Sequence, residues 1–381
     1  MTMKLRDFFA SHAVSTPCLV IDLDIVESNY RMLCQSFAGC SIYYAVKANP
    51  APEIIGRLRA LGSCFDAASL PEIELCLRLG VCPSKISWGN TIKRESDIAR
   101  AYERGIRLFA FDCEEELAKL SRVASGARVY CRVHMGTGES ACPVSAKFGC
   151  LEERAEYLLH MAHERGLEPY GVSFHLGSQQ TSMEHWDDAI GCCASLFRRL
   201  ESKGIGLRLL NLGGGFPVRY GCAVPSYSAY GGHVRACVAH HFGNRLPTMC
   251  IEPGRAMVAT SGVIKTEVLL VALRDDIGNG APWVYVDSGR SGGLVETVSK
   301  DIIYPLLSAT EEASETSETM EAILAGPTCD WSDILNEGIV RAVPKHLRSG
   351  DHLFFGNTGA YTSTCCSVGF NGFPPLTSYY I

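Results

Sequence analysis

Lys47 is the first residue of this chain whose type and position could do chemistry. It ends the strand-like apolar run Ser41–Val46, within Tyr-Ala-Val-Lys-Ala-Asn. Removing a lysine from water favours its neutral amine, which is the nucleophilic form. The position therefore predicts a lysine that forms an imine with a carbonyl compound.

Seven further apolar runs also end in polar residues or glycines. These ends are Asp66 after Leu61–Phe65, Gly89-Asn90 after Lys85–Trp88, Asp112 after Ile106–Phe111, His134 after Arg128–Val133 (which contains Arg132), His175 after Gly171–Phe174, Gly213-Gly214-Gly215 after Leu207–Leu212, and Glu252 after Pro247–Ile251. Between the runs lie segments with helical spacing, among them Glu72–Leu79, Arg94–Glu103, Glu153–Arg165 and His185–Ser202. Alternating strands and helices indicate a parallel sheet.

Eight such units in about 240 residues match a (β/α)8 barrel, in which the C-terminal strand ends converge on one site. An open doubly wound sheet with fewer strands is the alternative. The barrel predicts that the polar strand ends meet in space.

Two motifs near the last predicted barrel strands suggest a phosphate site. The glycine run in Asn211-Leu-Gly-Gly-Gly-Phe-Pro217 exposes successive backbone N–H groups, although triple glycines also form plain tight turns. Glu252-Pro-Gly-Arg255 could be a structural ion pair. Alongside Lys47, a second interpretation is better: Glu252 holds a protonated pyridine nitrogen, Arg255 helps to neutralise a phosphate, and His175 stacks on the ring.

Cys329 differs from most of the 18 cysteines because it lies in a loop-like stretch, Gly326-Pro-Thr-Cys-Asp330. A loop thiol beside a carboxylate can donate or accept a proton, although it could also be merely an exposed cysteine. After about residue 259 the pattern changes, and strands are predicted at Val263–Leu273, Trp283–Asp287, His352–Phe355 and Thr362–Val368. A second, mostly β domain is therefore expected, and the segment Pro17–Asp22 can join either domain.

The composition describes an ordinary globular protein, with 381 residues, 47% hydrophobic and 20% charged residues, and a net charge of −6. No cluster of lysine and arginine suggests a nucleic-acid or membrane partner. The N-terminus lacks a signal-peptide core and no run is long enough to cross a membrane, so we expect a cytoplasmic protein. The cysteines form no CxxC pair, so we predict no metal site.

These motifs together resemble the fold-type III pyridoxal-phosphate decarboxylases, alanine-racemase-like barrels that include the ornithine, lysine, arginine and diaminopimelate decarboxylases. The matching motifs are Tyr-Ala-Val-Lys47-Ala-Asn, Phe-Asp66-Ala-Ala-Ser, Lys147-Phe-Gly, Phe-His175-Leu-Gly-Ser178-Gln, Gly213-Gly-Gly, Glu252-Pro-Gly-Arg255, Cys329-Asp330, Gly-Ala-Tyr361 and Gly-Phe370-Asn-Gly-Phe. They run from residue 43 to residue 373 in the expected order. The Cys-Asp pair and the tail are similar to the bacterial-type ornithine/lysine branch.

The resemblance implies pyridoxal 5'-phosphate as cofactor and α-decarboxylation of an L-amino acid, ornithine or lysine first, giving its diamine for polyamine biosynthesis. The implied catalytic residues are Lys47 (imine with the cofactor), Glu252 (protonated ring nitrogen), His175 (ring face) and Cys329 (the proton returned to the α-carbon). The implied cofactor-binding residues also include Asp66, Arg132, Ser178, Gly214, Gly215, Gly254, Arg255 and Tyr361, and the substrate residues are Asp330, Ser299, Ser291 and Phe370. The barrel would span residues 20–258, and residues 259–381 with 1–19 would form the β domain. A homodimer with shared active sites is implied.

Two positions depart from the pattern of the ornithine/lysine branch. An acidic residue usually stands six positions before Pro305, where this chain has Ser299, and an aromatic residue is expected at Ser291. Asp330 remains, but a buried ammonium group needs paired charge. The two serines therefore favour an alternative: the same chemistry on a bulkier or less cationic amino acid derivative, in siderophore or other specialised metabolism.

Two further functions that this barrel could serve are less favoured. Amino acid racemisation uses the same barrel, but racemases of this fold generally use a tyrosine as second base rather than a Cys329-Asp330 loop. An inactive regulatory relative is disfavoured because Lys47, Glu252 and the glycine turn are all retained. The sequence does not decide whether the segment 135–147 closes over the site.

Overall fold

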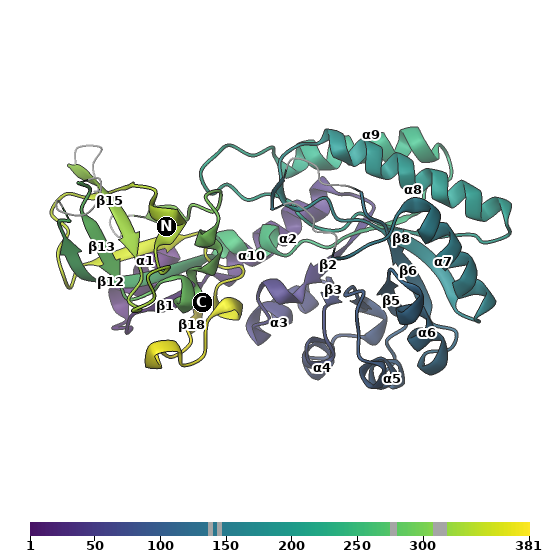
Figure 1. Ribbon diagram of the computed structural model, residues 1–381, viewed down its shortest axis with the longest axis horizontal. Coiled ribbons are helices and arrows are strands. Elements are labelled where there is room, and N and C mark those ends of the chain that lie inside the picture. Colours follow the sequence, from purple (N-terminus) through teal and green to yellow (C-terminus); the bar gives the residue numbers. More distant parts are fainter. Residues whose placement is uncertain (136–139, 143–146, 275–279, 308–317) are drawn as a thin grey trace. The chain divides into compact units, whose positions relative to one another are not determined.

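The computed structural model describes residues 1–135, 140–142, 147–274, 280–307 and 318–381 (Figure 1). Most of the segment 135–147 therefore lies outside the described residues. The chain divides into two compact units, which we describe separately. The barrel unit consists of Glu27–Pro217 and Val224–Met257, and the β unit consists of Met1–Val26, Val218–Ala223 and Val258–Ile381.

The barrel unit is a closed barrel of parallel strands in the order β10-β11-β2-β3-β4-β5-β6-β8. Its strands are β2 (Cys40–Ala45), β3 (Cys64–Ala67), β4 (Ile86–Trp88), β5 (Leu108–Phe111), β6 (Arg128–Arg132), β8 (Glu168–Ser173), β10 (Leu209–Asn211) and β11 (Thr248–Ile251). Each of the eight predicted runs overlaps one of these strands, so the prediction of a (β/α)8 barrel is confirmed.

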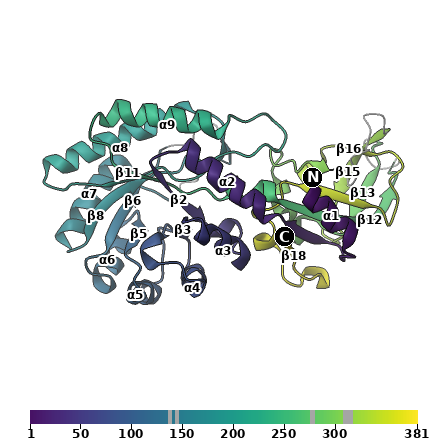
Figure 2. The same cartoon turned by 180° about the vertical axis from the view of Figure 1, so that it is seen from behind.

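Helices on the outside of the barrel cover the strands, as Figure 1 shows and as Figure 2 shows from behind. Their bounds are α2 (Leu23–Ser36), α3 (Pro52–Ala60), α4 (Leu70–Arg78), α5 (Glu95–Glu103), α6 (Glu114–Val123), α7 (Glu152–Glu164), α8 (Glu184–Ser202) and α9 (Tyr227–Phe242), followed by the short α10 (Arg255–Val258). The strands carry continuous apolar sequence because both of their faces are covered: every residue of β5 is buried. Inside the barrel, Leu108, Ala110, Tyr130, Leu209 and Cys250 form a buried cluster.

A buried ion pair lies next to strand β5 of the barrel. The Nζ atom of Lys93, whose side chain is fully buried, lies 3.0 Å from Glu116 Oε1 of α6 and donates to the carbonyl oxygen of Ala110 at 2.6 Å. Burial lowers the pKa of Lys93 to about 8, against the opposing effect of Glu116. Glu116 Oε2 also pairs with Lys119. Removing Glu116 is expected to be strongly destabilising, because it leaves the charge of Lys93 buried without its carboxylate partner.

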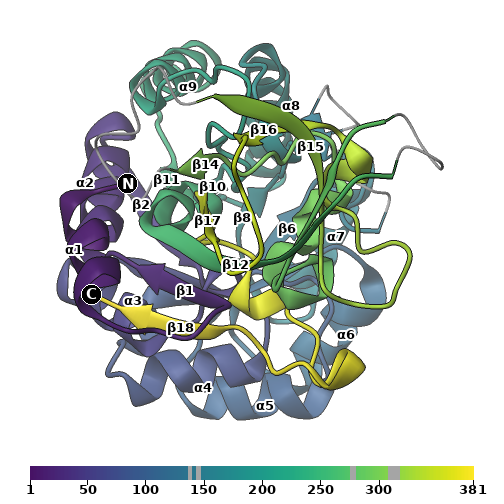
Figure 3. The ribbon, with the colours of Figure 1, turned by 90° about the vertical axis from the view of Figure 1, so that its left-hand side faces the viewer.

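The β unit contains an eight-stranded sheet with the path β14-β17-β12-β13-β15-β16, to which β1 and β18 are added. Its strands are β1 (Cys18–Ile21), β12 (Gly262–Ala272), β13 (Trp283–Val286), β14 (Leu306–Leu307), β15 (Thr319–Ala325), β16 (Arg341–Pro344), β17 (His352–Gly356) and β18 (Thr377–Tyr380). Figure 3 shows β1 beside β12 and β18; it pairs antiparallel with β12 and parallel with β18. The segment Pro17–Asp22, which the sequence left open, thus contributes its strand to this sheet.

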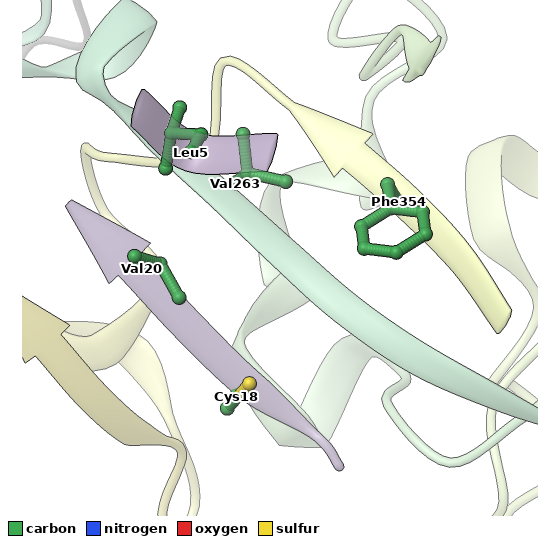
Figure 4. Packing of buried hydrophobic residues seen from close by; sticks show 5 residues of the cluster. All are labelled: Leu5, Cys18, Val20, Val263 and Phe354. Carbon is green, nitrogen blue, oxygen red and sulfur yellow. The ribbon is translucent and has the colours of Figure 1, made fainter. Parts of the chain in front are cut away.

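One hydrophobic cluster joins elements from both ends of the chain within the β unit. Leu5 of α1 (Met3–Ser11), Cys18 and Val20 of β1, Val263 of β12 and Phe354 of β17 pack together (Figure 4). The cluster explains why the N-terminal segment belongs to this unit: β1 and α1 bury their apolar side chains there.

One strand prediction in the β unit is wrong. Thr362–Val368 is not a strand but contains a 3-10 turn, Ser363–Cys365. The Thr362 hydroxyl donates to the carbonyl of Thr358 at 2.6 Å, and Cys365 N–H donates to the carbonyl of Thr362 at 3.0 Å. These local hydrogen bonds replace a strand ladder, so the β-branched residues did not decide the conformation.

A short antiparallel pair, β7 (Ser140–Cys142) with β9 (Ser178–Gln180), was not predicted. Its sequences are polar and short, which gives no periodic signal. Among the described helices, none is both long and apolar enough to cross a membrane.

Candidate active site

Lys47 lies on a 3-10 turn, Val46–Ala48, directly after β2 at the carboxyl end of the barrel. Its side chain is exposed, so the expectation that burial removes its charge is wrong. Instead its positive charge faces carboxyl groups: it lowers the pKa of Asp66 and of Glu252, and it also lowers the pKa of His175. The strand ends thus bring these side chains into electrostatic reach of one another.

The carboxyl groups of Asp66 and Glu252 interact electrostatically. Burial raises the pKa of Asp66 well above its usual range, and the neighbouring Glu252 raises it further. Burial also raises the pKa of Glu252. Asp66 lies within β3 rather than after it, and Gly89 makes room for it, since a Cβ there would lie 2.1 Å from Asp66 Oδ1.

Asn211 is a site residue that the sequence analysis quoted without giving it a role. Its Nδ2 donates to Glu252 Oε1 at 2.5 Å, and its Oδ1 accepts from Gly213 N–H at 2.9 Å. One carboxamide therefore connects the carboxylate after β11 to the glycine turn after β10. The hydrogen bond to Asn211 is the largest influence that lowers the pKa of Glu252 against burial.

His175, after β8, is a neutral imidazole. Burial lowers its pKa to about 3, with contributions from the positive charges of Arg132 and Lys47. Its Nδ1 accepts a hydrogen bond from Gly177 N–H at 2.9 Å, which places the ring proton on Nε2. An uncharged, flat ring is thereby presented at the barrel rim.

The glycine turn Gly213-Gly214-Gly215 is packed so closely that no side chain fits. Gly213 and Gly215 have φ values of +67° and +94°, which favour glycine. A Cβ at Gly214 would lie 2.5 Å from the carbonyl oxygen of Glu252, and one at Gly215 would lie 2.1 Å from that of Gly177. The turn is a cradle whose backbone can approach a ligand closely, next to the His175 ring.

The other predicted cofactor residues of the barrel unit also lie near strand ends. Arg132 ends β6, Ser178 begins β9, and the buried Arg255 follows Gly254 at the start of α10. The Arg132 guanidinium carbon lies 5.3 Å from the ring centre of Phe148, an aromatic neighbour that had been given no role.

In the β unit, the loop that carries Cys329 is organised by a residue that sequence reasoning missed, the buried Asp333. Its Oδ1 accepts from Arg290 N–H at 2.7 Å, and its Oδ2 accepts from the Thr328 hydroxyl at 2.6 Å. A Cβ at Gly289 or Gly326 would lie 2.2–2.3 Å from this carboxylate. Only the glycines flanking these contacts hint at such a buried acid in the sequence.

The remaining predicted residues all lie in the β unit. Asp330 follows Cys329 and is exposed; hydrogen bonds from Ser332 lower the pKa of its carboxyl. Ser291 and Phe370 line the same cavity of about 40 Å³. Ser299 follows the turn Val295–Val298, and its carbonyl accepts from the buried Asn336 at 3.0 Å. Tyr361 stands in the left-handed region with φ +55°.

The residues of the barrel rim fit pyridoxal phosphate. Lys47 offers an amine for covalent attachment, His175 a neutral ring face, Glu252 a carboxylate for a ring nitrogen, and the glycine cradle backbone donors for a phosphate. The glycine cradle supports this fit, because a side chain at these positions would fill the space that the turn leaves for a ligand. Within the described residues, no group of three or more His, Cys, Asp or Glu could hold a metal ion.

Enzymes that bind pyridoxal phosphate at the mouth of a parallel barrel form the class to which this fold and rim correspond. Residues 23–259 match the family described as "Pyridoxal-dependent decarboxylase, pyridoxal binding domain", and the chain belongs to this family. It is a pyridoxal-phosphate-dependent lyase of the amino acid decarboxylase type. The resemblance drawn from the motifs is therefore confirmed.

Several proteins similar to this chain are named as amino acid decarboxylases. The lysine/ornithine decarboxylase of Selenomonas ruminantium is 31% identical over 365 residues, covering 94% of this chain and 88% of that protein. The arginine decarboxylase of Paramecium bursaria Chlorella virus, bound to agmatine, has a TM-score of 0.90 at 26% identity and covers 100% of both chains. The lysine/ornithine decarboxylase of Vibrio vulnificus, complexed with putrescine, has a TM-score of 0.88 at 28% identity, covering 100% of this chain and 99% of that chain.

Proposed function

We propose that this enzyme removes the α-carboxyl group of a basic L-amino acid, ornithine or lysine first, and releases CO2 and the diamine. The lowered pKa of the Asp330 carboxyl is the observation that supports the proposal. Its exposed carboxyl has a pKa lowered by hydrogen bonds from Ser332, so it stays ionised at neutral pH and can pair with a cationic side chain. Two similar proteins are named lysine/ornithine decarboxylases, which supports ornithine or lysine as the substrate.

Lys47, Glu252 and His175 each have a separate role toward the cofactor. Pyridoxal phosphate, when bound, supplies the electron sink for the pair that remains after CO2 leaves. Lys47 Nζ attaches the cofactor, and the ionised Glu252, supported by Asn211, keeps a proton on the ring nitrogen. His175 lies against the ring as an uncharged face, and it does not compete for that proton because its pKa is about 3.

The other proposed residues bind the phosphate, return the proton and surround the substrate. The cradle Gly213–Gly215 with Ser178, Gly254 and Arg255 binds the phosphate, while Asp66 and Arg132 complete the cofactor site. The resemblance to the family adds Tyr361 as a phosphate-binding residue. Cys329 Sγ steers or delivers the proton to the α-carbon once CO2 has left. Asp330, Ser291, Ser299 and Phe370 surround the substrate side chain.

The alternative is the same reaction on a bulkier or less cationic amino acid derivative. Ser299 favours it, because its hydroxyl contacts the exposed Asp301 Oδ2 at 3.4 Å and Asp301 N–H at 3.1 Å, in place of an acidic side chain. With Ser291 also small, fewer charges and more volume are available for the substrate.

A panel of substrates separates these two possibilities. CO2 release from cofactor-loaded protein is measured with L-ornithine, L-lysine, L-arginine, meso-diaminopimelate and a citryl-diamino acid conjugate. Strong turnover of ornithine or lysine, with KM raised about tenfold or more in Asp330→Asn, supports the leading proposal. Turnover of only diaminopimelate or the conjugate contradicts it and supports the alternative.

A matched variant tests the placement of Ser299. Ser299→Asp restores the acidic residue of the ornithine/lysine branch and is expected to raise kcat/KM for ornithine about tenfold. Val298→Asp changes the neighbouring residue, which is 50% exposed, and is expected to change nothing. If the two variants behave alike, Ser299 does not face the substrate.

We also propose a cytoplasmic homodimer in polyamine metabolism, with each site shared between subunits. Large apolar side chains near Cys329 support a covered surface: Trp331 is 88% exposed, Val368 86%, Phe370 40% and Phe373 41%. The test mixes Lys47→Ala with Cys329→Ala protein, each of which is expected to be inactive on its own. Shared sites restore about a quarter of the activity, because half of the random dimers carry one intact site. No restoration after verified subunit exchange refutes sharing.

A further inference from the structure

The side chain of Asn371 lies against Cys329 within the β unit. Its Oδ1 accepts from Cys329 N–H at 3.0 Å, and its Nδ2 contacts Cys329 Sγ as a donor at 3.5 Å. Both ends of one carboxamide are thus used on a single residue 42 positions earlier in the chain.

The backbone around Asn371 is built without the help of this carboxamide. Asn371 has φ +51°, a left-handed conformation that asparagine adopts more readily than most residues. The turn Phe370–Gly372 is closed by Phe373 N–H to the carbonyl of Phe370 at 3.1 Å and by Gly372 N–H to that of Gly369 at 2.9 Å. The side chain is therefore available for Cys329.

The loop of Cys329 also has an anchor of its own. Asp333 holds Thr328 and Arg290 at the base of the loop through the hydrogen bonds described above. Because this anchor does not involve Asn371, the loop does not depend on the carboxamide for its overall course. What the carboxamide adds is contact with the thiol itself.

We propose that Asn371 is a positioning residue that fixes the Cys329 thiol for proton delivery. The inference rests on the proposed role of Cys329 in the decarboxylation. When Nδ2–H donates to Sγ, the sulfur is the acceptor, so its own S–H points elsewhere and is free to transfer. After the proton leaves, the same N–H stabilises the negative sulfur.

The test compares Asn371→Gly with Asn357→Gly. Glycine accepts the left-handed backbone at both positions, so only the carboxamide is removed. Asn357 is a matched control because it has φ +59° and its side chain donates a hydrogen bond of 2.9 Å to the carbonyl of Arg219. In the part of the chain that the structure describes, no hydrogen bond joins the Asn357 side chain to Cys329. Asn371→Asp is a third variant, which keeps the acceptor oxygen but replaces the donor by a negative charge.

Three readouts are taken on cofactor-loaded protein. Alkylation of Cys329 by iodoacetamide at pH 7 is followed by peptide mass spectrometry, with the exposed Cys222 of the same digest as reference. CO2 release gives kcat and KM, and thermal unfolding gives Tm. In Asn371→Gly, alkylation and kcat should each fall about tenfold with KM and Tm little changed; in Asn371→Asp they should fall further, and Asn357→Gly should change neither.

Alkylation and kcat at wild-type values in Asn371→Gly, or faster alkylation, would overturn the inference. A loss of kcat accompanied by an equal loss in Asn357→Gly, or by a fall in Tm, would also overturn it, because the role would then be structural. The proposed function fails differently: Cys329→Ala would then release CO2 at the wild-type rate. If Cys329→Ala is slow and Asn371→Gly is unchanged, only the inference about Asn371 is wrong.

Discussion

Replacing Asn211 with alanine is expected to weaken cofactor binding and to make it fail at a higher pH than in the wild-type enzyme. The carboxamide makes two hydrogen bonds, to Glu252 Oε1 at 2.5 Å and from Gly213 N–H at 2.9 Å. The first supports the carboxylate for the ring nitrogen, and the second holds the turn of the phosphate cradle. Losing both should affect the two ends of the cofactor.

The magnitude follows from these two contacts. A hydrogen bond to a charged group is worth about 1.5–3 kcal/mol, and a buried N–H left without a partner costs about 1–3 kcal/mol. The first loss alone corresponds to roughly tenfold to a hundredfold in the dissociation constant of the cofactor. The second loss should appear mainly as a lower Tm of the protein without cofactor.

The pH dependence has a definite sign. Burial raises the pKa of Glu252, and the hydrogen bond from Asn211 opposes this effect. Without the hydrogen bond the pKa is higher still. Since the ionised carboxylate is the form that holds the ring proton, binding is retained above this pKa and lost as the pH falls through it. The loss should therefore begin at higher pH in Asn211→Ala.

The assay is a titration of cofactor-free protein with pyridoxal phosphate, followed by absorbance at several pH values between 5.5 and 8.5. Asn90→Ala is the control, because Asn90 also follows a barrel strand and its carboxamide also makes two hydrogen bonds, to the carbonyl of Ala68 at 3.3 Å and from Ile92 N–H at 3.4 Å. Asn211→Asp keeps an acceptor for Gly213 but places a second carboxylate against Glu252, so it should bind more weakly than Asn211→Ala. A dissociation constant in Asn211→Ala that equals the wild-type value at every pH would refute the reasoning.

The remaining predictions concern His175, the buried ion pair and the cradle. The pKa of His175 is about 3 in the folded protein against an ordinary 6.5, so the stability that the neutral ring confers is complete above pH 6.5 and is lost as the pH falls. His175→Phe should therefore reduce the fall in the free energy of unfolding between pH 6.5 and 4.5 by about 2–3 kcal/mol, measured by urea unfolding. Parallel plots of this free energy against pH for the wild type and the variant would contradict the prediction. Glu116→Gln leaves the buried Lys93 without its carboxylate partner and should lower the free energy of unfolding by about 3–5 kcal/mol. The control, Glu115→Gln at an exposed position, should change it by less than about 0.5 kcal/mol, and equal effects of the two variants would argue against the ion pair. Gly215→Ala would place a Cβ 2.1 Å from a carbonyl oxygen and should abolish cofactor binding. The control, Gly204→Ala, has a positive φ but nothing within 4 Å, so it should retain cofactor binding and lose only about 1–2 kcal/mol of stability. Wild-type cofactor affinity in Gly215→Ala would refute the close packing of the cradle.

Much of the barrel could be predicted because its signals are local. Runs of buried residues such as those ending before Lys47 and His175 are short, apolar and separated by helical spacing, and each overlaps a strand in the structure. The β unit was less predictable, since Thr362–Val368 has strand-like residues but is held by its own turn hydrogen bonds. Polar β9, with Ser178, gave no periodic signal at all.

The sequence by itself determined which side chains stand at the ends of the barrel strands, because strand order and burial follow from local periodicity and parallel strands end at one rim. Only the tertiary structure decided how these side chains act on one another. Asn211 meets Glu252 because β10 lies beside β11, and Asn371 meets Cys329 across 42 residues of chain. The exposure of Lys47 and the pKa directions of Asp66 and Glu252 likewise depend on the summed surroundings of each group, which no spacing along the chain encodes.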